Sequence, residues 1–409
     1  MRVIDLFAGA GGLSEGFREE GYDIVAHVEM DESASYTLKT REAFHFLKEH
    51  NQLELYRNYL IGKITRDELY QNIPTDVLKR VINSEISDHT IDEIFGEIDS
   101  LLDGEHAKII IGGPPCQAYS VAGRSRDPKR MKDDPRNFLY KQYIKFLERY
   151  QPELFIFENV NGMLSADNGE IFENIQNEMK NAGYKIDYKI LNAKDFGVLQ
   201  SRKRVILVGW RSDIAYSYPQ FETINTKSNI RDLFSDLPAI KAGERILVGN
   251  FYKELDEESY VRKYIRDDEW DILTQHIARP NREQDLKIYK LCVQHWNKEG
   301  VKLKYNELPR NLITHSNTGS FLDRFNVVPF DGISHTVVAH ISKDGHNYIH
   351  PDLDQNRSIS VREAARIQSF PDNYYFETSR TAAFKQIGNA VPPLMAQQIA
   401  KKIKMDFFE

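Results

Sequence analysis

The sequence predicts an α/β fold in which a mostly parallel sheet carries the functional site and a smaller, irregular lobe follows. Ile109, Ile110 and Ile111 form a β-branched run without polar residues, as is typical of a strand buried on both faces of a parallel sheet. A second apolar run near the N-terminus leads into a glycine-rich turn, as strands of such sheets do when they approach a ligand. With 409 residues, the chain is long enough for two lobes.

The composition of the chain argues against a membrane protein, a disulfide-bonded protein and a metal-binding protein. No run of about 18 apolar residues is present to span a bilayer, and the N-terminus lacks the layout of a signal peptide. Cys116 and Cys292 are the only cysteines, which excludes a disulfide framework and a cysteine zinc site. The histidines between His276 and His350 lack the spacing of metal ligands. We therefore expect a cytoplasmic protein without membrane contact or bound metal.

The net charge of −7 is unevenly distributed. The segment 41–107 holds 7 Lys or Arg against 14 Asp or Glu, which accounts for the whole imbalance. Its apolar residues recur at three- and four-residue spacing, so we expect an acidic helical insertion that faces solvent. The rest of the chain is neutral overall, and net charge therefore neither supports nor excludes a nucleic-acid partner.

The first two strands predict a cofactor site. Residues 3–7 form an apolar run that leads into Gly9 and Gly11, where the backbone can approach a ligand before a helix begins. The next apolar run, residues 23–28, is followed by Glu29, and an acidic residue at this place can accept hydrogen bonds from ribose hydroxyls. A solvated charge is the alternative for Glu29 taken alone.

Cys116 follows the isoleucine strand across two glycines and two prolines. The prolines fix φ and prevent a helical start, so the thiol is expected on a stiff loop beyond the strand. The alternative is a buried structural cysteine. Arg124, Arg126 and Arg136 lie in the polar stretch that follows, either as a solvated loop or as phosphate contacts.

Two further segments bring charged groups toward this loop. The apolar run 154–157 ends in Glu158, and strands that are parallel end at one edge of the sheet, where Glu158 would meet Cys116. Gln200, Arg202 and Arg204 alternate before another apolar run, which places them on one face of an extended chain. An ordinary charged strand edge is the alternative for these three.

The remaining chain is less regular. Residues 216–357 contain few long periodic segments and predict a second lobe with short strands. Ser360, with Glu363 three residues later, predicts a capped helix start. A turn at Asn389 precedes a terminal helix.

Together these motifs resemble the DNA (cytosine-5) methyltransferase family of bacterial restriction–modification systems. DLFAGAGG, HVEMD, GGPPCQAYS, ENV, QSRKR, REAARIQSFPD and GNAVPP occur in the order of that family and close to its spacings. They extend over the chain except for the acidic segment and the irregular lobe. Ala118 and Tyr119 replace the commoner Pro and Phe of the cysteine motif, and Glu85 matches the family's third acidic contact only loosely.

The resemblance implies an S-adenosylmethionine-dependent methyltransferase fold. It assigns residues 1–215 and 385–409 to the catalytic domain, 216–357 to a target-recognition domain and 358–384 to a hinge segment between them. Double-stranded DNA would lie between the lobes. The implied contacts to S-adenosylmethionine are Phe7, Gly9, Gly11, Glu29, Met30, Glu85, Pro115, Leu139 and Asn389.

The resemblance also implies a reaction. Cys116 would attack C6 of a flipped-out cytosine, so that C5 can accept the methyl group. Glu158 would stabilise the ring, and Arg202 and Arg204 would hold the base and the active loop. Arg124, Arg126, Arg136 and Gln200 are the candidate DNA contacts.

We expect a monomer, with a restriction endonuclease acting separately as a candidate partner. Two alternatives are a tRNA cytosine-5 methyltransferase and a catalytically inactive DNA-binding relative. The Cys-Phe-Thr motif of the tRNA branch is missing, and a long recognition lobe is present. The inactive relative is disfavoured because the four candidate catalytic residues are all intact.

Overall fold

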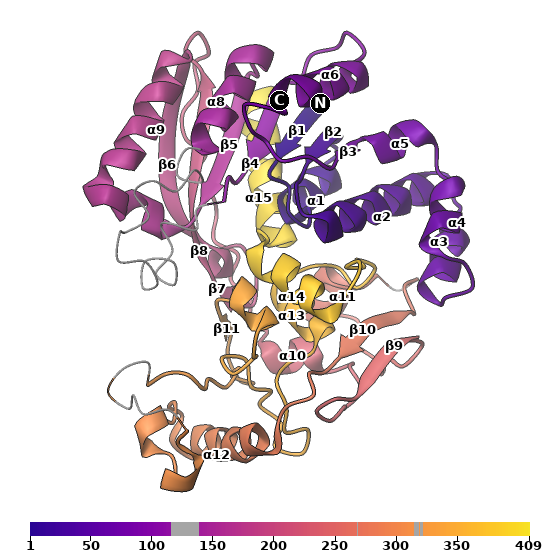
Figure 1. Ribbon diagram of the computed structural model, residues 1–409, viewed down its shortest axis with the longest axis vertical. Coiled ribbons are helices and arrows are strands. Elements are labelled where there is room, and N and C mark those ends of the chain that lie inside the picture. Colours follow the sequence, from indigo (N-terminus) through magenta and orange to yellow (C-terminus); the bar gives the residue numbers. More distant parts are fainter. Residues whose placement is uncertain (116–138, 268, 315–318, 320–321) are drawn as a thin grey trace.

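The computed structural model describes residues 1–115, 139–267, 269–314, 319 and 322–409. A seven-stranded sheet with the order β3-β2-β1-β4-β5-β8-β6 forms its centre (Figure 1). The strands are β1 (Arg2–Leu6), β2 (Asp23–Val28), β3 (Val81–Ile82), β4 (Ile109–Gly112), β5 (Leu154–Asn159), β6 (Tyr184–Asn192) and β8 (Lys203–Arg211). Strands β3, β2, β1, β4 and β5 pair in parallel, whereas β8 is antiparallel to both β5 and β6. The predicted mostly parallel sheet is confirmed.

Both faces of the sheet are covered at β4, where successive apolar side chains point to opposite faces. Ile109 and Ile111 of β4 belong to a core shared with α1 (Gly12–Glu19) and α15 (Pro393–Ile403). Ile110 points to the other face, where α6 (Ile91–Leu102), α8 (Leu139–Tyr150) and α9 (Glu170–Asn181) pack. The continuous isoleucine run therefore reflects a strand buried on two sides.

Helix α15 brings the end of the chain back to its beginning, as the resemblance implies. A Cβ at Gly16 of α1 would lie 2.3 Å from the backbone nitrogen of Gln397 and 2.5 Å from the Cβ of Ala396. We expect Gly16→Ala to lower the free energy of unfolding by about 1–3 kcal/mol, because the two helices would have to separate. Gly96 of α6 is the control, since nothing lies within 4 Å of its Cβ position. Gly96→Ala should raise stability by about 0.5–1 kcal/mol in the same urea titration.

The expectation for residues 41–107 is wrong in two respects. Residues 41–49 continue α2 (Glu32–Glu49), in which Arg41 and Glu42 are buried. Burial is tolerated because Arg41 pairs with Glu15, at 2.5 Å, and Glu42 pairs with Arg18. At the other end of the segment, β3 extends the sheet and α6 covers it. Only α3 (Leu53–Leu60), α4 (Arg66–Gln71) and α5 (Thr75–Lys79) stand apart from the sheet.

The second lobe is irregular and contains short strands, as expected. Its strands β9 (Arg245–Gly249) and β10 (Leu273–Ile277) form an antiparallel pair, and β11 (Ser334–His335) pairs in parallel with β7 (Gln200–Ser201). The helices are α10 (Ile230–Phe234), α11 (Tyr260–Tyr264) and α12 (Glu283–Glu299). The 17-residue helix α12 was not expected. Its buried side chains Ile288, Tyr289, Cys292 and Val293 repeat at helical spacing, a signal that was present in the sequence.

Residues 358–384 form buried packing between the lobes. Ser360 and Glu363 make the predicted capping box at the start of α13 (Val361–Ile367). Arg366 of α13 is fully buried and donates to Asp372 at 2.6 Å and to Asp236 at 2.5 Å. Helix α14 (Arg380–Asn389) follows and packs near the short 3-10 helix η7 (Ala339–Ser342). The link between the lobes is thus a solid, hydrogen-bonded core.

His276 of the second lobe is a hydrogen-bonded core residue. His276 contacts the Ser360 hydroxyl at 2.8 Å and the Pro238 carbonyl at 2.9 Å, and burial lowers its pKa to about 4. Within the described ranges, no three His, Cys, Asp or Glu side chains are grouped so that they could hold a metal ion. Nor is any helix in that part of the chain both long and apolar enough to cross a membrane.

Candidate active site

The strand ends that carry several of the predicted site residues meet at one edge of the sheet. Because β1, β4 and β5 are parallel and in register, Leu6, Gly112 and Phe157 lie side by side near their carboxyl ends. Strand β8 runs the other way, so its beginning reaches the same edge, with Val205 opposite Asn159. The strand order reverses between β1 and β4, and ligands bind at such a point in open α/β sheets.

Glu158 and Arg204 form an ion pair at this edge. The Nε of Arg204 donates to Oε1 of Glu158 at 2.9 Å, and the two side chains are 11% and 13% exposed, respectively. Burial lowers the pKa of the Arg204 guanidinium, and the adjacent Glu158 carboxylate acts in the opposite direction. A nearly buried acid is thus held in place by one cation while it keeps a small opening to solvent.

The loop after β4 is fitted against this carboxylate. A Cβ at Gly113 would lie 2.6 Å from Oε2 of Glu158, so glycine at this position leaves room for the carboxylate. Asn159 fixes the next residue, because its side-chain nitrogen donates to the Pro114 carbonyl at 3.2 Å. Asn159 is a positioning residue that the sequence analysis did not assign, although it lies within the ENV motif. Cys116, Arg124, Arg126 and Arg136 lie outside the described residues.

The glycine-rich turn and Glu29 form a second part of the site. Phe7, Gly9 and Gly11 all have positive φ, at 55°, 57° and 74°. Glu29 accepts hydrogen bonds from the backbone N–H of Gly9 at 2.8 Å and of Asp31 at 2.7 Å. Burial raises the pKa of the Glu29 carboxyl, while these two bonds act to lower it. The carboxylate therefore links the turn after β1 to the end of β2.

The other predicted cofactor residues differ in how far their side chains are exposed. Met30, next to Glu29, is 61% exposed, an unusual position for a large apolar side chain. Glu85 follows β3 and is exposed, and nearby Asn83 donates to the carbonyls of Glu29 and Met30 at 2.9 and 3.2 Å. Asn83 was not assigned by the sequence analysis. Of the remaining three residues, Pro115 and Leu139 are half-buried and Asn389, the last residue of α14, is exposed.

The assignment of Gln200 as a DNA contact is wrong. Its side chain is fully buried and donates to Gln368 Oε1 at 2.7 Å and to the Ile367 carbonyl at 3.2 Å. It also accepts from the Val337 N–H at 2.8 Å. An amide with these partners in the protein core has no path to DNA. The alternation of residue types showed the shared face but not that this face is covered.

Arg202 is buried as well and acts through the backbone. Its guanidinium donates to the carbonyls of Val337 at 2.6 Å and Gly388 at 3.2 Å, and burial lowers its pKa well below the usual value. A Cβ at Gly388 would lie 2.3 Å from the nitrogen of Ala339, so this junction is tightly packed. In this structure Arg202 therefore joins three segments of the chain and makes no surface that a base could contact.

The resemblance assigns Glu29 to the site for S-adenosylmethionine, and on that assignment we expect Glu29→Gln to weaken binding of this ligand about tenfold or more. A neutral amide can accept only through one oxygen, so one of the two backbone N–H donors loses its partner and the turn shifts. Titration calorimetry with S-adenosylmethionine measures the change. The matched control is Glu32→Gln, because Glu32 is exposed in the first turn of α2. Equal donor affinity in the two variants would contradict the role of Glu29.

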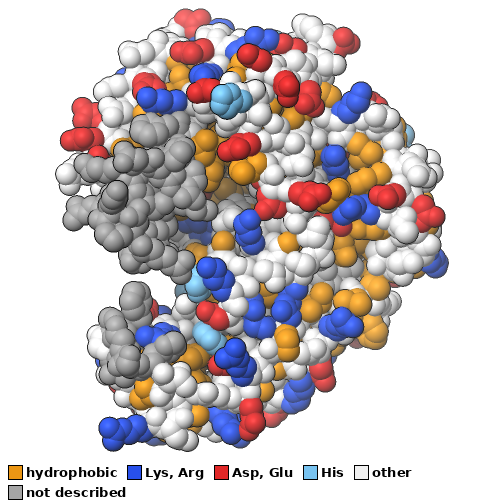
Figure 2. Space-filling view, viewed as in Figure 1, with side chains coloured by type: hydrophobic (Ala, Val, Ile, Leu, Met, Phe, Trp, Pro, Cys, Tyr) orange, Lys and Arg blue, Asp and Glu red, His pale blue; other side chains and the backbone are white. Residues whose placement is uncertain are grey.

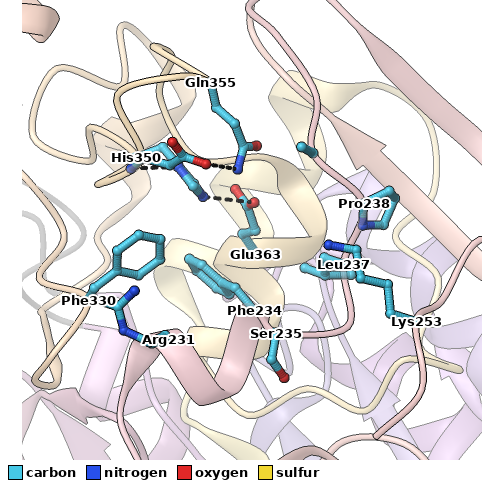
Figure 3. A pocket seen from close by; sticks show the side chains of 12 residues that line it. Arg231, Phe234, Ser235, Leu237, Pro238, Lys253, Phe330, His350, Gln355 and Glu363 are labelled. Carbon is cyan, nitrogen blue, oxygen red and sulfur yellow. Dashed lines mark hydrogen bonds and ion pairs between the residues drawn. The ribbon is translucent and has the colours of Figure 1, made fainter.

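A separate cavity of about 180 Å³ lies in the second lobe (Figure 3). The rings of Phe234 and His350 stack there at 5.8 Å, and His350 lies 3.5 Å from Glu363. Gln355 donates to Asp352 at 3.0 Å. None of the predicted site residues that the structure describes lines this cavity. This cavity is therefore distinct from the site at the sheet edge.

The fold defines the class of protein first. A crystal structure of a prophage-encoded Escherichia coli protein, assigned as a DNA modification methyltransferase, matches over 100% of both chains with a TM-score of 0.66 at 23% identity. The Entamoeba histolytica methyltransferase EhMeth matches over 100% of this chain and 99% of its own, with a TM-score of 0.56 at 15% identity. At these identities the likeness shows a methyltransferase fold.

Sequence comparison gives the family. The model of the C-5 cytosine-specific DNA methylase family matches residues 1–65 and 65–405, and the chain belongs to that family. The type II methyltransferase M.Bpa9945I of Bacillus paralicheniformis is 43% identical over 99% of this chain and 98% of its own length. M.DdeI of Desulfomicrobium norvegicum is 32% identical over 100% of this chain and 89% of its own. The protein is therefore a DNA cytosine-5 methyltransferase of the bacterial restriction–modification type, with DNA as its substrate and a methyl donor of the S-adenosylmethionine type.

Proposed function

We propose that this protein methylates C5 of a cytosine within a specific sequence of double-stranded DNA, with Cys116 as a covalent nucleophile. The observation that carries the proposal is the Glu158–Arg204 pair, which lies against the loop Gly113–Pro114 that leads directly to Cys116. An acid held next to a thiol-bearing loop matches what addition to a pyrimidine ring requires.

The Cys116 thiolate adds to C6 of the cytosine, which breaks the C5–C6 double bond, and Glu158 supplies a proton at N3. C5 then carries the electron pair that would form the bond to the donor's methyl group, and the electron pair of the broken sulfur–methyl bond would stay on the donor's sulfur, which leaves as a neutral thioether. Loss of the C5 proton to a base restores the double bond and expels the thiolate, while N3 returns its proton. Arg204 orients the Glu158 carboxylate throughout, and Arg202 joins its own segment to those of Val337 and Gly388.

The residues at the ends of β1 and β2 fit S-adenosylmethionine. Space is open at Gly9, where nothing lies within 4 Å of a Cβ position, and the exposed Met30 offers an apolar face for adenine. Glu29 retains lone pairs for ribose hydroxyls beyond its two backbone bonds. When bound, the donor supplies an activated methyl group. This chain supplies the contacts that place that group near the end of β4.

DNA would bind between the lobes. Figure 2 shows the molecule hollowed between its upper and lower parts, with Lys and Arg side chains at the inner end of the hollow. The cytosine must leave the duplex to reach the sheet edge, at a cost of a few kcal/mol. We assign residues 216–357 to target recognition and Arg124, Arg126 and Arg136 to backbone contacts. We also propose that a restriction endonuclease acts separately as the partner of this protein, because the relatives are named as type II methyltransferases.

Bisulfite sequencing tests the function. The chain is expressed in a strain without cytosine methylation, and its genomic DNA is sequenced after bisulfite treatment. We expect protected cytosines at one short recurring sequence. Absence of protected cytosines, or protection without sequence preference, would contradict the proposal.

A further inference from the structure

The helices between residues 53 and 79, here called the 53–79 helices, contact both lobes. In Figure 1, α3 and α4 lie at the right of the view, above β9 and β10 of the second lobe. The hollow between the lobes opens on the left in the same view (Figure 2). Contacts between the two lobes on the side opposite this hollow determine how far the lobes can separate.

Polar contacts join α3 to the second lobe through one arginine. Arg57 forms an ion pair with Asp271 and donates to the carbonyl of Glu269 at 2.6 Å. Its guanidinium also lies 5.1 Å from the ring centre of Trp270. Arg57 therefore makes an ion pair, a hydrogen bond and a cation–π contact with three consecutive residues, and these residues lead into β10.

An apolar cluster lies beneath these polar contacts. Tyr56 of α3 is 0% exposed and Trp270 is 2% exposed, and their rings lie 6.1 Å apart. Phe44 of α2 approaches the same Trp270 ring at 6.3 Å. Buried members of the cluster come from both lobes: Ala43, Phe44, Leu47, Tyr56, Leu60, Leu69, Ile73, Trp270 and Ile272. Separation of the lobes here would expose a continuous apolar surface.

The same helices connect to the cofactor side of the catalytic domain. Tyr59 donates to Glu377 at 2.7 Å, and Thr40 of α2 donates to the same carboxylate at 2.6 Å. Gln275 of β10 in turn exchanges two hydrogen bonds with the backbone of Phe376, at 2.7 and 3.0 Å. Helix α2 begins directly after Glu29, with Asp31 as its cap. One continuous set of contacts thus runs from the donor site to the β9–β10 pair.

We propose that the 53–79 helices are a brace that fixes the angle between the lobes, and that Arg57 is a positioning residue for DNA binding. This inference rests on the proposed binding of DNA between the lobes. It replaces the expectation that this acidic segment only faces solvent. When the two lobes are already held at the angle that DNA binding requires, binding carries no free-energy cost for ordering the lobes. The brace therefore raises the affinity and the selectivity for the target sequence.

The test is Arg57→Ala in the full chain. We expect the KM for target DNA to rise about five- to tenfold and the preference over sequences with one altered base pair to fall by a similar factor. The kcat at saturating DNA and the KM for S-adenosylmethionine should stay within twofold of wild type. The matched control is Arg149→Ala, because Arg149 forms the same kind of half-exposed contacts, with Asp99 and the Phe95 ring, inside one lobe.

A charge exchange separates the brace from a folding defect. The double variant Arg57→Asp, Asp271→Arg restores the ion pair but not the contacts with Glu269 and Trp270, so its KM for DNA should fall below that of Arg57→Ala. Arg57→Asp alone places two carboxylates side by side and should raise the KM above that of Arg57→Ala. Equal DNA KM in Arg57→Ala and Arg149→Ala would overturn the proposal, as would a loss confined to kcat. If the wild-type protein itself fails to methylate DNA, the proposed function fails instead.

Discussion

Replacement of Cys116 by alanine is expected to abolish methyl transfer, with a loss of at least about 10⁴-fold in turnover. Without the thiolate, C5 of cytosine has no electron pair with which to accept the methyl group, and neighbouring residues cannot replace that covalent bond. The measurement is methylation of target DNA, together with trapping on DNA that carries 5-fluorocytosine. Fluorine at C5 cannot leave as a proton does, so a covalent adduct of the active protein persists.

The chain offers a matched control in its second cysteine. Cys292 is buried in α12, and burial raises its pKa to about 12, so it is a poor nucleophile. We expect Cys292→Ala to keep both methylation and trapping, with a modest loss of stability. A covalent complex that survives Cys116→Ala, or disappears in Cys292→Ala, would show that the nucleophile is wrongly assigned.

Glu158→Gln is expected to lower kcat about 10²- to 10³-fold while binding of the methyl donor changes little. Glutamine has nearly the same shape but cannot deliver a proton to N3, and its neutral side chain pairs poorly with Arg204. Single-turnover methylation and donor calorimetry measure the two quantities separately. Glu29 and Met30, the proposed donor contacts, follow β2, whereas Glu158 ends β5. The two effects should therefore separate.

The control for Glu158 comes from the other end of its strand. Glu153 precedes β5 and pairs with Lys108 at 3.6 Å, far along the strand from the site. Glu153→Gln should leave kcat unchanged. If donor affinity falls as much as kcat in Glu158→Gln, then Glu158 maintains the architecture of the site and does not take part in proton transfer.

Much of the fold follows from local sequence. The isoleucine run of β4 predicts a strand that is covered on both faces, since no polar residue interrupts it. The capping box of α13 depends on a spacing of three residues and was predicted for the same local reason. Glu29 was likewise assigned by its distance from the glycine turn, and the structure joins the two by a hydrogen bond. The roles of these site residues in binding and catalysis remain predictions.

Other features depend on which surfaces become covered. Gln200 and Arg204 have the same spacing pattern, yet Gln200 is enclosed by the segments near Val337 and Gln368, which are distant in sequence. The expectation that the acidic segment 41–107 faces solvent is wrong in part, because it rests only on the number of charged residues in the segment. Arg41 is buried there because its partner Glu15 comes from another helix.

The sequence by itself determined the buried isoleucine strand, the glycine turn and the capping box of α13, because these depend on neighbours within a few residues. Only the tertiary structure decided that Glu158 pairs with Arg204, that Arg202 is a buried connector and that α3 contacts the second lobe. Burial and ion pairing are properties of segments brought together by packing, and a pattern along one segment contains no information about its partner.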